Sequence, residues 1–136
     1  MTDDKELITR TYNDYIRAFH TLDPRAFAPY YHLPCLVISP PKPVALASSA
    51  EVEAYFERVT RGLKARNYAR TEFTELRVQP LCVETALLHA RGARYKADGE
   101  KLQALAATYL FQRMGSDWKI AVIVMHDPAT LAPHST

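Results

Sequence analysis

The segment Lys101–His126 constrains the fold more than any other part of the chain. It holds two runs rich in β-branched and aromatic residues, Leu102–Arg113 and Trp118–Met125, on either side of Gly115-Ser116. Gly115 can adopt the positive φ that a short hairpin turn requires, so we predict two antiparallel strands joined at this turn. Apolar residues occur at both parities of each run, which means that both faces of the hairpin must be covered.

Length and composition suit a single domain over residues 1–136 with a loop-like tail over 127–136. The chain is 48% hydrophobic and 24% charged, and its net charge of +2 comes from scattered Lys and Arg, so we expect no nucleic-acid partner. The polar N-terminus lacks the apolar core of a signal peptide, and no apolar run could span a bilayer. We therefore expect a cytoplasmic protein with no membrane partner. Cys35 and Cys82 fit either two free thiols or one disulfide.

Helical and strand patterns alternate along the first half of the chain. Apolar residues every three or four positions predict helices, while proline-bounded apolar runs predict short strands. Asp3 with Glu6, and Ser48 with Glu51, have the spacing of N-terminal capping boxes. The expected elements are a helix over 3–20, a short helix from Asp23 to Tyr31, strands at 35–39 and 44–47, and a helix from Ser48 to about Arg66.

Strands follow from Tyr68, with a bulge expected near Thr74 and a second hairpin turn at Asp98-Gly99. Centring the two hairpins on their glycine turns places Tyr109 opposite both Leu88 and Val122, and directly opposed residues share a face. One face is then expected to carry Leu88, Ala90, Leu105, Ala107, Tyr109, Phe111, Trp118, Ile120, Val122, Val124 and His126. The other face is expected to carry Leu87, His89, Arg91, Ala106, Thr108, Leu110, Ala121, Ile123 and Met125.

The first face is bulkier, so we expect it to meet the helices, and a second copy of the chain to cover the other face as a homodimer. A slip of one residue in either hairpin would exchange the two faces.

Three stretches together resemble the nuclear transport factor 2-like superfamily, in its SnoaL-like branch, which is related to polyketide cyclases and ketosteroid isomerases. These stretches are Tyr12–Phe19 with Asp23, Glu53–Phe56, and Thr108–Ile120 with its Gly-x-x-Trp-Lys-Ile turn. The resemblance covers nearly the whole chain. It implies an α+β fold in which a cone-shaped, strongly curved antiparallel sheet packs on three N-terminal helices around an apolar pocket. It does not select an activity, because this fold carries many.

The resemblance to the ketosteroid isomerases also provides a test of chemistry. Their enolate-stabilising Tyr matches Tyr15, but their proton-shuttling Asp falls on Ser39 and their protonated Asp falls near Tyr109. A further Tyr of theirs falls on Phe56. Proton abstraction beside a carbonyl needs a base that titrates near the working pH, and serine is none. The sequence therefore argues against steroid isomerase chemistry while leaving Tyr15 and Tyr109 as hydrogen-bond donors.

We predict a small-molecule pocket, possible in two forms: a cofactor-independent acid–base enzyme of lyase, isomerase or hydrolase type, or a non-catalytic binding or dimerisation module. In the enzyme, His126 is the best available base, while the alternative that it is only a half-exposed histidine at a strand end stays open and is favoured by the sequence alone. Its substrate would be largely apolar and carry oxygen. No histidine pair or phosphate loop indicates a metal or a cofactor. The expected site comprises Tyr15, Tyr109 and His126 as catalytic groups and Phe19, Tyr31, Ser39, Phe56, Leu88 and Val122 as pocket lining.

Overall fold

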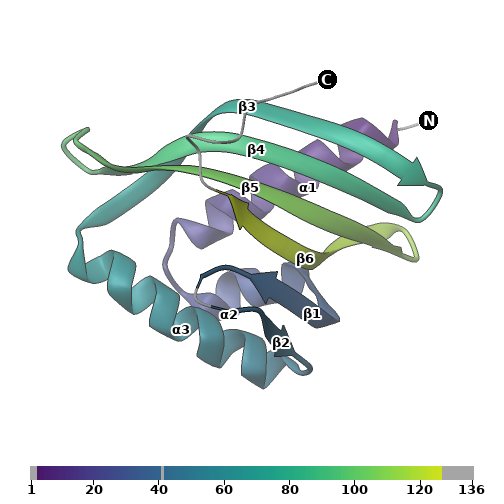
Figure 1. Cartoon of the computed structure of the whole chain (residues 1–136), viewed down its shortest axis with the longest axis horizontal. Helices are drawn as coiled ribbons and strands as arrows, with labels where there is room; N and C mark the ends of the chain where they lie inside the picture. The colour runs from purple at the N-terminus through teal and green to yellow at the C-terminus, as the bar shows by residue number, and fades with distance from the viewer. Residues whose placement is uncertain (1–2, 41, 127–136) are drawn as a thin grey trace.

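The computed structural model describes residues 3–40 and 42–126, which form three helices, one short 3-10 helix and a six-stranded sheet. The sheet lies across one side of the molecule with α1 behind it, while α2 and α3 lie beside β1 and β2 (Figure 1). Its elements are α1 Asp4–Phe19, α2 Pro24–Phe27, η1 Ala28–Tyr30, β1 Tyr31–Ile38, β2 Val44–Leu46, α3 Ser49–Ala65, β3 Tyr68–Cys82, β4 Thr85–Lys96, β5 Lys101–Met114 and β6 Asp117–His126. The predicted α+β class is confirmed.

The strand order is β2-β1-β6-β5-β4-β3. All neighbouring strands are antiparallel except β1 and β6, which run parallel, so the sheet is mixed and not wholly antiparallel as predicted. Hairpin turns reveal antiparallel pairs in a sequence, but β1 and β6 are separated by most of the chain and no local signal records their pairing. In the part of the chain that the structure describes, no helix is long and apolar enough to cross a membrane.

Local capping explains two of the three helix starts. The Asp23 carboxylate accepts from the Arg25 N–H at 3.1 Å, and the Ser48 hydroxyl accepts from the Glu51 N–H at 3.2 Å, as their spacing predicts. The capping box predicted at Asp3 is wrong, because its side chain makes no capping hydrogen bond. Tyr31 is also reassigned, since it opens β1 instead of closing the second helix.

The first long hairpin has the predicted register: Leu88 pairs with Tyr109, and the pattern holds as far as Arg94 with Gln103. The bulge expected near Thr74 is also present, as a register shift between Phe73 and Glu75. Gly92 lies opposite this bulge, and a Cβ on it would come within 2.1 Å of the Glu72 carbonyl oxygen. Only glycine fits this close approach of β3 and β4.

The second hairpin departs from the prediction beyond its turn. Phe111 pairs with Ile120 as expected, but Leu110 pairs with Val122, so Ala121 is an extra residue in β6. One inserted residue moves all later side chains of the strand to the opposite face. Tyr109 consequently faces Ile123 and not Val122, and Ala106 instead of Leu105 faces His126. The predicted faces of β6 are therefore wrong from Val122 onward.

The core fills the space between the helices and the inner face of the sheet. Its fully buried side chains include Ile8 and Tyr12 from α1, Phe27 from α2, and Leu88 and Phe111 from the long strands. Cys35 and Cys82 are both free, with Cys35 buried and Cys82 exposed, so the disulfide alternative is wrong. Burial raises the pKa of the Cys35 thiol to about 11, which keeps it protonated and unreactive. The predicted tail over 127–136 lies outside the described residues.

Candidate functional site

A cavity of about 250 Å³ lies between α1, α3 and the inner face of the sheet. Its volume is just below the usual range of small-molecule pockets, about 300–1,000 Å³, so its occupant must be small. All of the main elements contribute to its wall except α2 and β2. The lining residues are Tyr12, Tyr15, Ile16, Phe19, Val37, Ser39, Tyr55, Phe56, Val59, Thr71, Phe73, Arg94, Gln103, Leu105, Tyr109, Ile123 and Met125.

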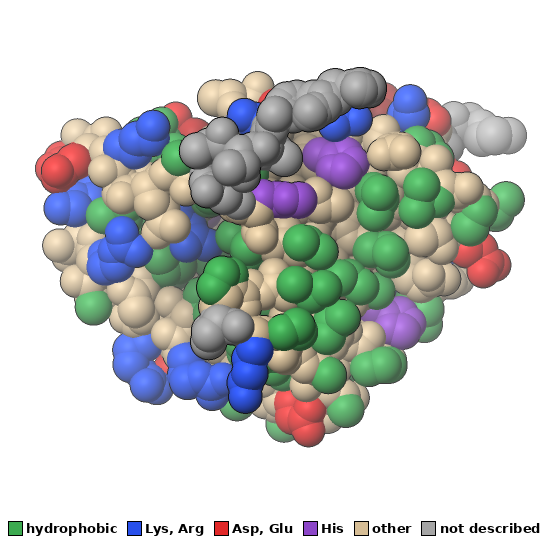
Figure 2. All heavy atoms as spheres, in the orientation of Figure 1, with side chains coloured by type: hydrophobic (Ala, Val, Ile, Leu, Met, Phe, Trp, Pro, Cys, Tyr) green, Lys and Arg blue, Asp and Glu red, His purple; other side chains and the backbone are tan. Residues whose placement is uncertain are grey.

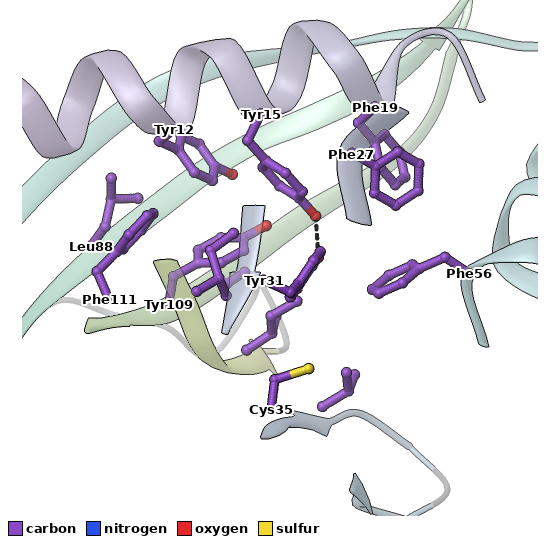
Figure 3. Packing of buried hydrophobic residues seen from close by; sticks show 14 of the residues in the cluster. Tyr12, Tyr15, Phe19, Phe27, Tyr31, Cys35, Phe56, Leu88, Tyr109 and Phe111 are labelled. Atoms are coloured by element: carbon purple, nitrogen blue, oxygen red, sulfur yellow. Dashed lines mark hydrogen bonds between the residues drawn. The ribbon is translucent and has the colours of Figure 1, made fainter. Parts of the chain in front are cut away.

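Buried tyrosines form the centre of the wall, with Tyr12, Tyr15 and Tyr109 turned toward one another (Figure 3). The Tyr12 and Tyr109 rings meet edge to face with centroids 4.8 Å apart, and the Tyr15 hydroxyl shares a hydrogen bond with the Tyr31 hydroxyl. Tyr12 and Tyr15 lie on one face of α1 because they are three residues apart in a helix. The tyrosines of this cluster are buried, and none of them is more than 6% exposed.

Burial sets the protonation of these tyrosines. It raises the pKa of Tyr12, Tyr15, Tyr31 and Tyr109 above the ordinary value of 10, since a phenolate would lose its hydration. All four stay neutral at physiological pH and act as hydrogen-bond donors and acceptors. They cannot serve as bases there, which limits their chemistry to orienting a ligand or stabilising a negative charge that develops on it.

Three polar side chains occupy the strand-end side of the cavity. Arg94 on β4 lies directly between Thr71 on β3 and Gln103 on β5 in the ladder. The Gln103 side-chain oxygen accepts from Arg66 Nη1 at 2.8 Å, and the Thr71 hydroxyl is 2.6 Å from the Tyr68 hydroxyl. Arg94 is the one charged side chain among the described lining residues. The site thus combines an aromatic interior with a cationic end.

The structure brings five of the predicted site residues together in the cavity wall: Tyr15, Phe19, Ser39, Phe56 and Tyr109. Tyr31 joins the site indirectly through its hydrogen bond to Tyr15. Leu88 does not line the cavity, because it is fully buried in the packed core. The positions matched to the isomerase acids and third-helix tyrosine, Ser39, Tyr109 and Phe56, all face this one space.

Val122 and His126 are placed on the other side of the sheet, because the extra residue at Ala121 turns them outward. His126 Nε2 lies 2.6 Å from the Thr108 hydroxyl, which is also 3.0 Å from His89 Nδ1. Burial lowers the pKa of both histidines. The interpretation of His126 as a general base inside the pocket is therefore corrected: its ring belongs to a hydrogen-bonded group on the outer face.

The sequence interpretation missed Arg94, Gln103 and Met125. Leu88 and Ala90 lie on the inner face of β4, and Arg94 has the same parity four residues after Ala90. Arg94 could therefore have been found by extending the alternation along the strand. Met125 could not, since its position depends on the bulge. No cluster of three His, Cys, Asp or Glu side chains suited to a metal ion occurs within residues 3–40 and 42–126.

Comparison with known proteins agrees with this architecture. The model of a family described as NTF2-like protein (DUF6841) matches residues 4–128. A cystatin-like domain of unknown function from Nostoc punctiforme superposes with a TM-score of 0.77 at 17% identity, covering 96% of this chain and 81% of that one. Yeast UBP3-associated protein Bre5 gives 0.76 at 15% identity, with 93% and 97% covered.

A proposed dehydratase of the NTF2-like family from Streptomyces avermitilis gives a TM-score of 0.69 at 16% identity, covering 90% of this chain and 94% of that one. At these identities the likeness concerns the fold alone. No curated protein sequence matches the chain. The predicted superfamily is confirmed, while the SnoaL-like branch stays a prediction.

Proposed function

The chain belongs to the NTF2-like family, and we propose that it binds a small, largely apolar molecule carrying one or two oxygen atoms in the cavity between α1, α3 and the sheet. The observation that carries this proposal is the largely aromatic wall of the cavity, which includes the buried side chains of Tyr12, Tyr15 and Tyr109. Apolar walls bearing a few placed polar groups are typical of small-molecule sites. A purely structural cone would instead be filled by its own side chains.

Binding without turnover is the form that the lining supports best. An acid–base reaction of lyase, isomerase or hydrolase type needs a base, and neither a carboxylate nor an imidazole occurs among the described lining residues. Tyr15 and Tyr109 would act as donors to a ligand oxygen in either case. The two free thiols suit a reducing compartment, so a cytoplasmic location is part of the same proposal.

The two methionines of the described chain allow a direct test of binding. Met125 lines the cavity, whereas Met114 lies exposed at the distant hairpin turn. With ¹³C-methyl-labelled methionine, titration with 2-phenylethanol or 2-phenylacetamide is expected to shift the Met125 methyl resonance in NMR spectra and leave Met114 unchanged. Removing the Tyr109 hydroxyl as Tyr109→Phe should weaken binding about threefold to tenfold, the worth of one neutral hydrogen bond, with little change in melting temperature.

The control is a variant that fills the cavity. Val59→Trp adds bulk from α3 at a half-buried lining position and should abolish the Met125 shift. The ligand-binding proposal is wrong if neither probe shifts the Met125 resonance of the wild type at millimolar concentration. It is also wrong if the Met114 resonance shifts equally.

A second function, homodimerisation, is supported by the outer face of the same sheet. Leu36, Leu87, Leu110 and Val122 lie in one row across four neighbouring strands, and Ile38 and Val124 continue the next row. All six are only half-buried in the single chain. Hydrophobic side chains gather over β5, β6 and β1 on the face viewed in Figure 2.

We propose that a second copy of the chain covers this row, since a two-fold axis would bring the same apolar strip of both copies together. Val122→Lys would then place like charges across the interface. Light scattering is expected to report a monomer for this variant and a dimer for the wild type; a wild-type monomer at high micromolar concentration contradicts the proposal.

A further inference from the structure

Arg94 is the least satisfied polar side chain of the cavity wall. Its Nε atom is buried and has no hydrogen-bond partner. No salt bridge or hydrogen bond involves its guanidinium within the described residues, although most other arginines of the protein pair with a carboxylate. A buried N–H without a partner is costly, so a group of this kind usually has a function or a partner that binds.

The surroundings of Arg94 supply only neutral groups. The described cavity lining contains no Asp or Glu, and the groups nearest in the ladder are Thr71 and Gln103. The charge of Arg94 acts on the hydroxyls of Tyr12, Tyr15 and Tyr109, where it partly opposes the rise in pKa that burial causes. The guanidinium therefore interacts electrostatically with the tyrosine cluster. Its positive charge has no counter-ion among the described lining residues of the cavity.

We propose that Arg94 anchors the carboxylate of the ligand, and that the cavity accordingly takes a small monocarboxylic acid with a flat apolar body. This inference rests on the proposed ligand-binding function and specifies its substrate class. The Nε and Nη2 atoms of an arginine form a planar fork that matches the two oxygens of a carboxylate. No acceptor among the described residues occupies the Nε–H of Arg94.

Two neighbours of Arg94 suit an anion. The Gln103 side-chain oxygen is already bonded to Arg66, which leaves its NH₂ group to donate toward the cavity. Arg66 itself comes from the end of α3 and adds a second positive charge beside Gln103. Lysine and arginine side chains gather over α3 on the surface shown in Figure 2. A ligand carboxylate would thus meet donors and positive charge at this end.

Other parts of the cavity wall suit an apolar ring or short chain. Phe19, Phe56 and Val59 supply apolar wall from two helices, and Ile123 and Met125 supply it from β6. Burying such a body contributes about 25 cal/mol per Å² removed from water. Since the volume is about 250 Å³, one aromatic ring with a short acidic side chain fits and a steroid does not.

The test compares two probes of nearly equal shape that differ in charge, phenylacetate and 2-phenylacetamide, at pH 7.5. Affinities are read from the Met125 methyl resonance, with Met114 as the internal reference. Wild type is expected to bind phenylacetate at least tenfold more tightly than the amide, because a hydrogen bond to a charged group contributes more than a neutral one. Arg94→Gln should erase this preference and retain the amide affinity, while Arg94→Lys should keep part of it.

Arg91→Gln is the matched control, because Arg91 lies on the same strand and faces the outer side. It removes the same charge and should leave the preference intact. Equal wild-type affinity for the two probes, or a preference that survives Arg94→Gln, overturns the carboxylate assignment while ligand binding stands. Loss of the Met125 shift with both probes overturns the proposed function itself. Arg94→Gln without ligand should melt no lower than wild type, because it removes an uncompensated cation.

Discussion

The two faces of the sheet are built from alternate residues of the same strands, yet their polar groups and aromatic content differ. On the inner face, the described residues that line the cavity include several aromatic side chains and one cation, Arg94. The outer face carries a row of aliphatic side chains beside the hydrogen-bonded group of His89, Thr108 and His126. A period of two in a strand is enough to separate the proposed binding site from the proposed dimer surface.

The difference also shows how much depends on one residue. Ala121 is the extra residue of β6, and it decides that Ile123 and Met125 meet the cavity while Val122 and His126 face outward. Bulges recur beside functional sites because they redirect side chains without ending the strand. Here the bulge places Met125 in the cavity wall and His126 on the outer face, so His126 does not serve as a base inside this cavity.

The largest effect is expected from introducing a charge on one or the other face of β6 directly after this bulge. Ile123 is 5% exposed and its lysine variant would bury an unpaired cation in a cavity that already contains Arg94. We expect Ile123→Lys to lower the free energy of unfolding by about 3 kcal/mol or more, measured by urea denaturation. Val122→Lys should cost under about 1 kcal/mol, because its side chain can reach water.

The pair is decisive because the two positions are adjacent. If Val122→Lys proves the more damaging variant in the monomeric state, the bulge is misplaced and His126 returns to the cavity side. Measuring both at low protein concentration separates folding from any loss of a dimer interface.

The sequence predicts correctly those features that depend on residues close together in the chain. The turn glycines and the parity of Leu88 and Tyr109 are local, and they gave the correct register of the β4–β5 hairpin. Tyr15, Ser39 and Phe56 were placed in the pocket through the family resemblance, and they line it. The register prediction is confirmed because it relied on a short-range pattern. The site roles of Tyr15, Ser39 and Phe56 stay predictions.

The remaining features depend on contacts that no local pattern encodes. Neither the bulge at Ala121 nor the parallel pairing of β1 with β6 has a turn or a glycine beside it, so alternation alone extended the wrong faces beyond Ile120. The isolation of Arg94 is visible only in three dimensions, because an unpaired arginine looks the same in sequence as a surface one.

An intermediate effect is expected at Gly92, which keeps β3 and β4 in contact where the inner face bends. A Cβ there would meet the Glu72 carbonyl oxygen at 2.1 Å and the Phe73 Cα at 2.9 Å, both backbone atoms that cannot rotate away. Gly92→Ala should therefore lower the free energy of unfolding by about 2 kcal/mol or more. Since Arg94 is two residues away, phenylacetate affinity should also fall.

Gly62→Ala provides the matched control for this prediction. Gly62 lies in α3, and a Cβ on it has no atom within 4 Å. Alanine is the better helix former, so the same substitution there should stabilise the protein by about 0.5–1 kcal/mol. Thermal melts in which both glycine variants change stability in the same direction would refute the close approach of β3 and β4 as the cause.

The smallest effect, a pH dependence, should arise from the outer face and not from the cavity. Burial lowers the pKa of His89 and His126 below the ordinary value of 6.5, and Arg77 and His126 lower that of His89 further. The folded state therefore binds fewer protons than the unfolded chain, so stability is fully present above pH 6.5. It is lost as the pH falls from 6.5 through the folded-state pKa values.

We expect the melting temperature to fall between pH 7 and pH 5, and a His89→Gln, His126→Gln double variant to fall less. The slope should not vanish, because burial also lowers the pKa of His20, which accepts the Thr71 N–H at 3.0 Å. The neutral tyrosines of the cavity contribute nothing in this range, since burial raises their pKa above 10. A double variant with an unchanged slope would assign the acid sensitivity to His20 and the inner layer instead.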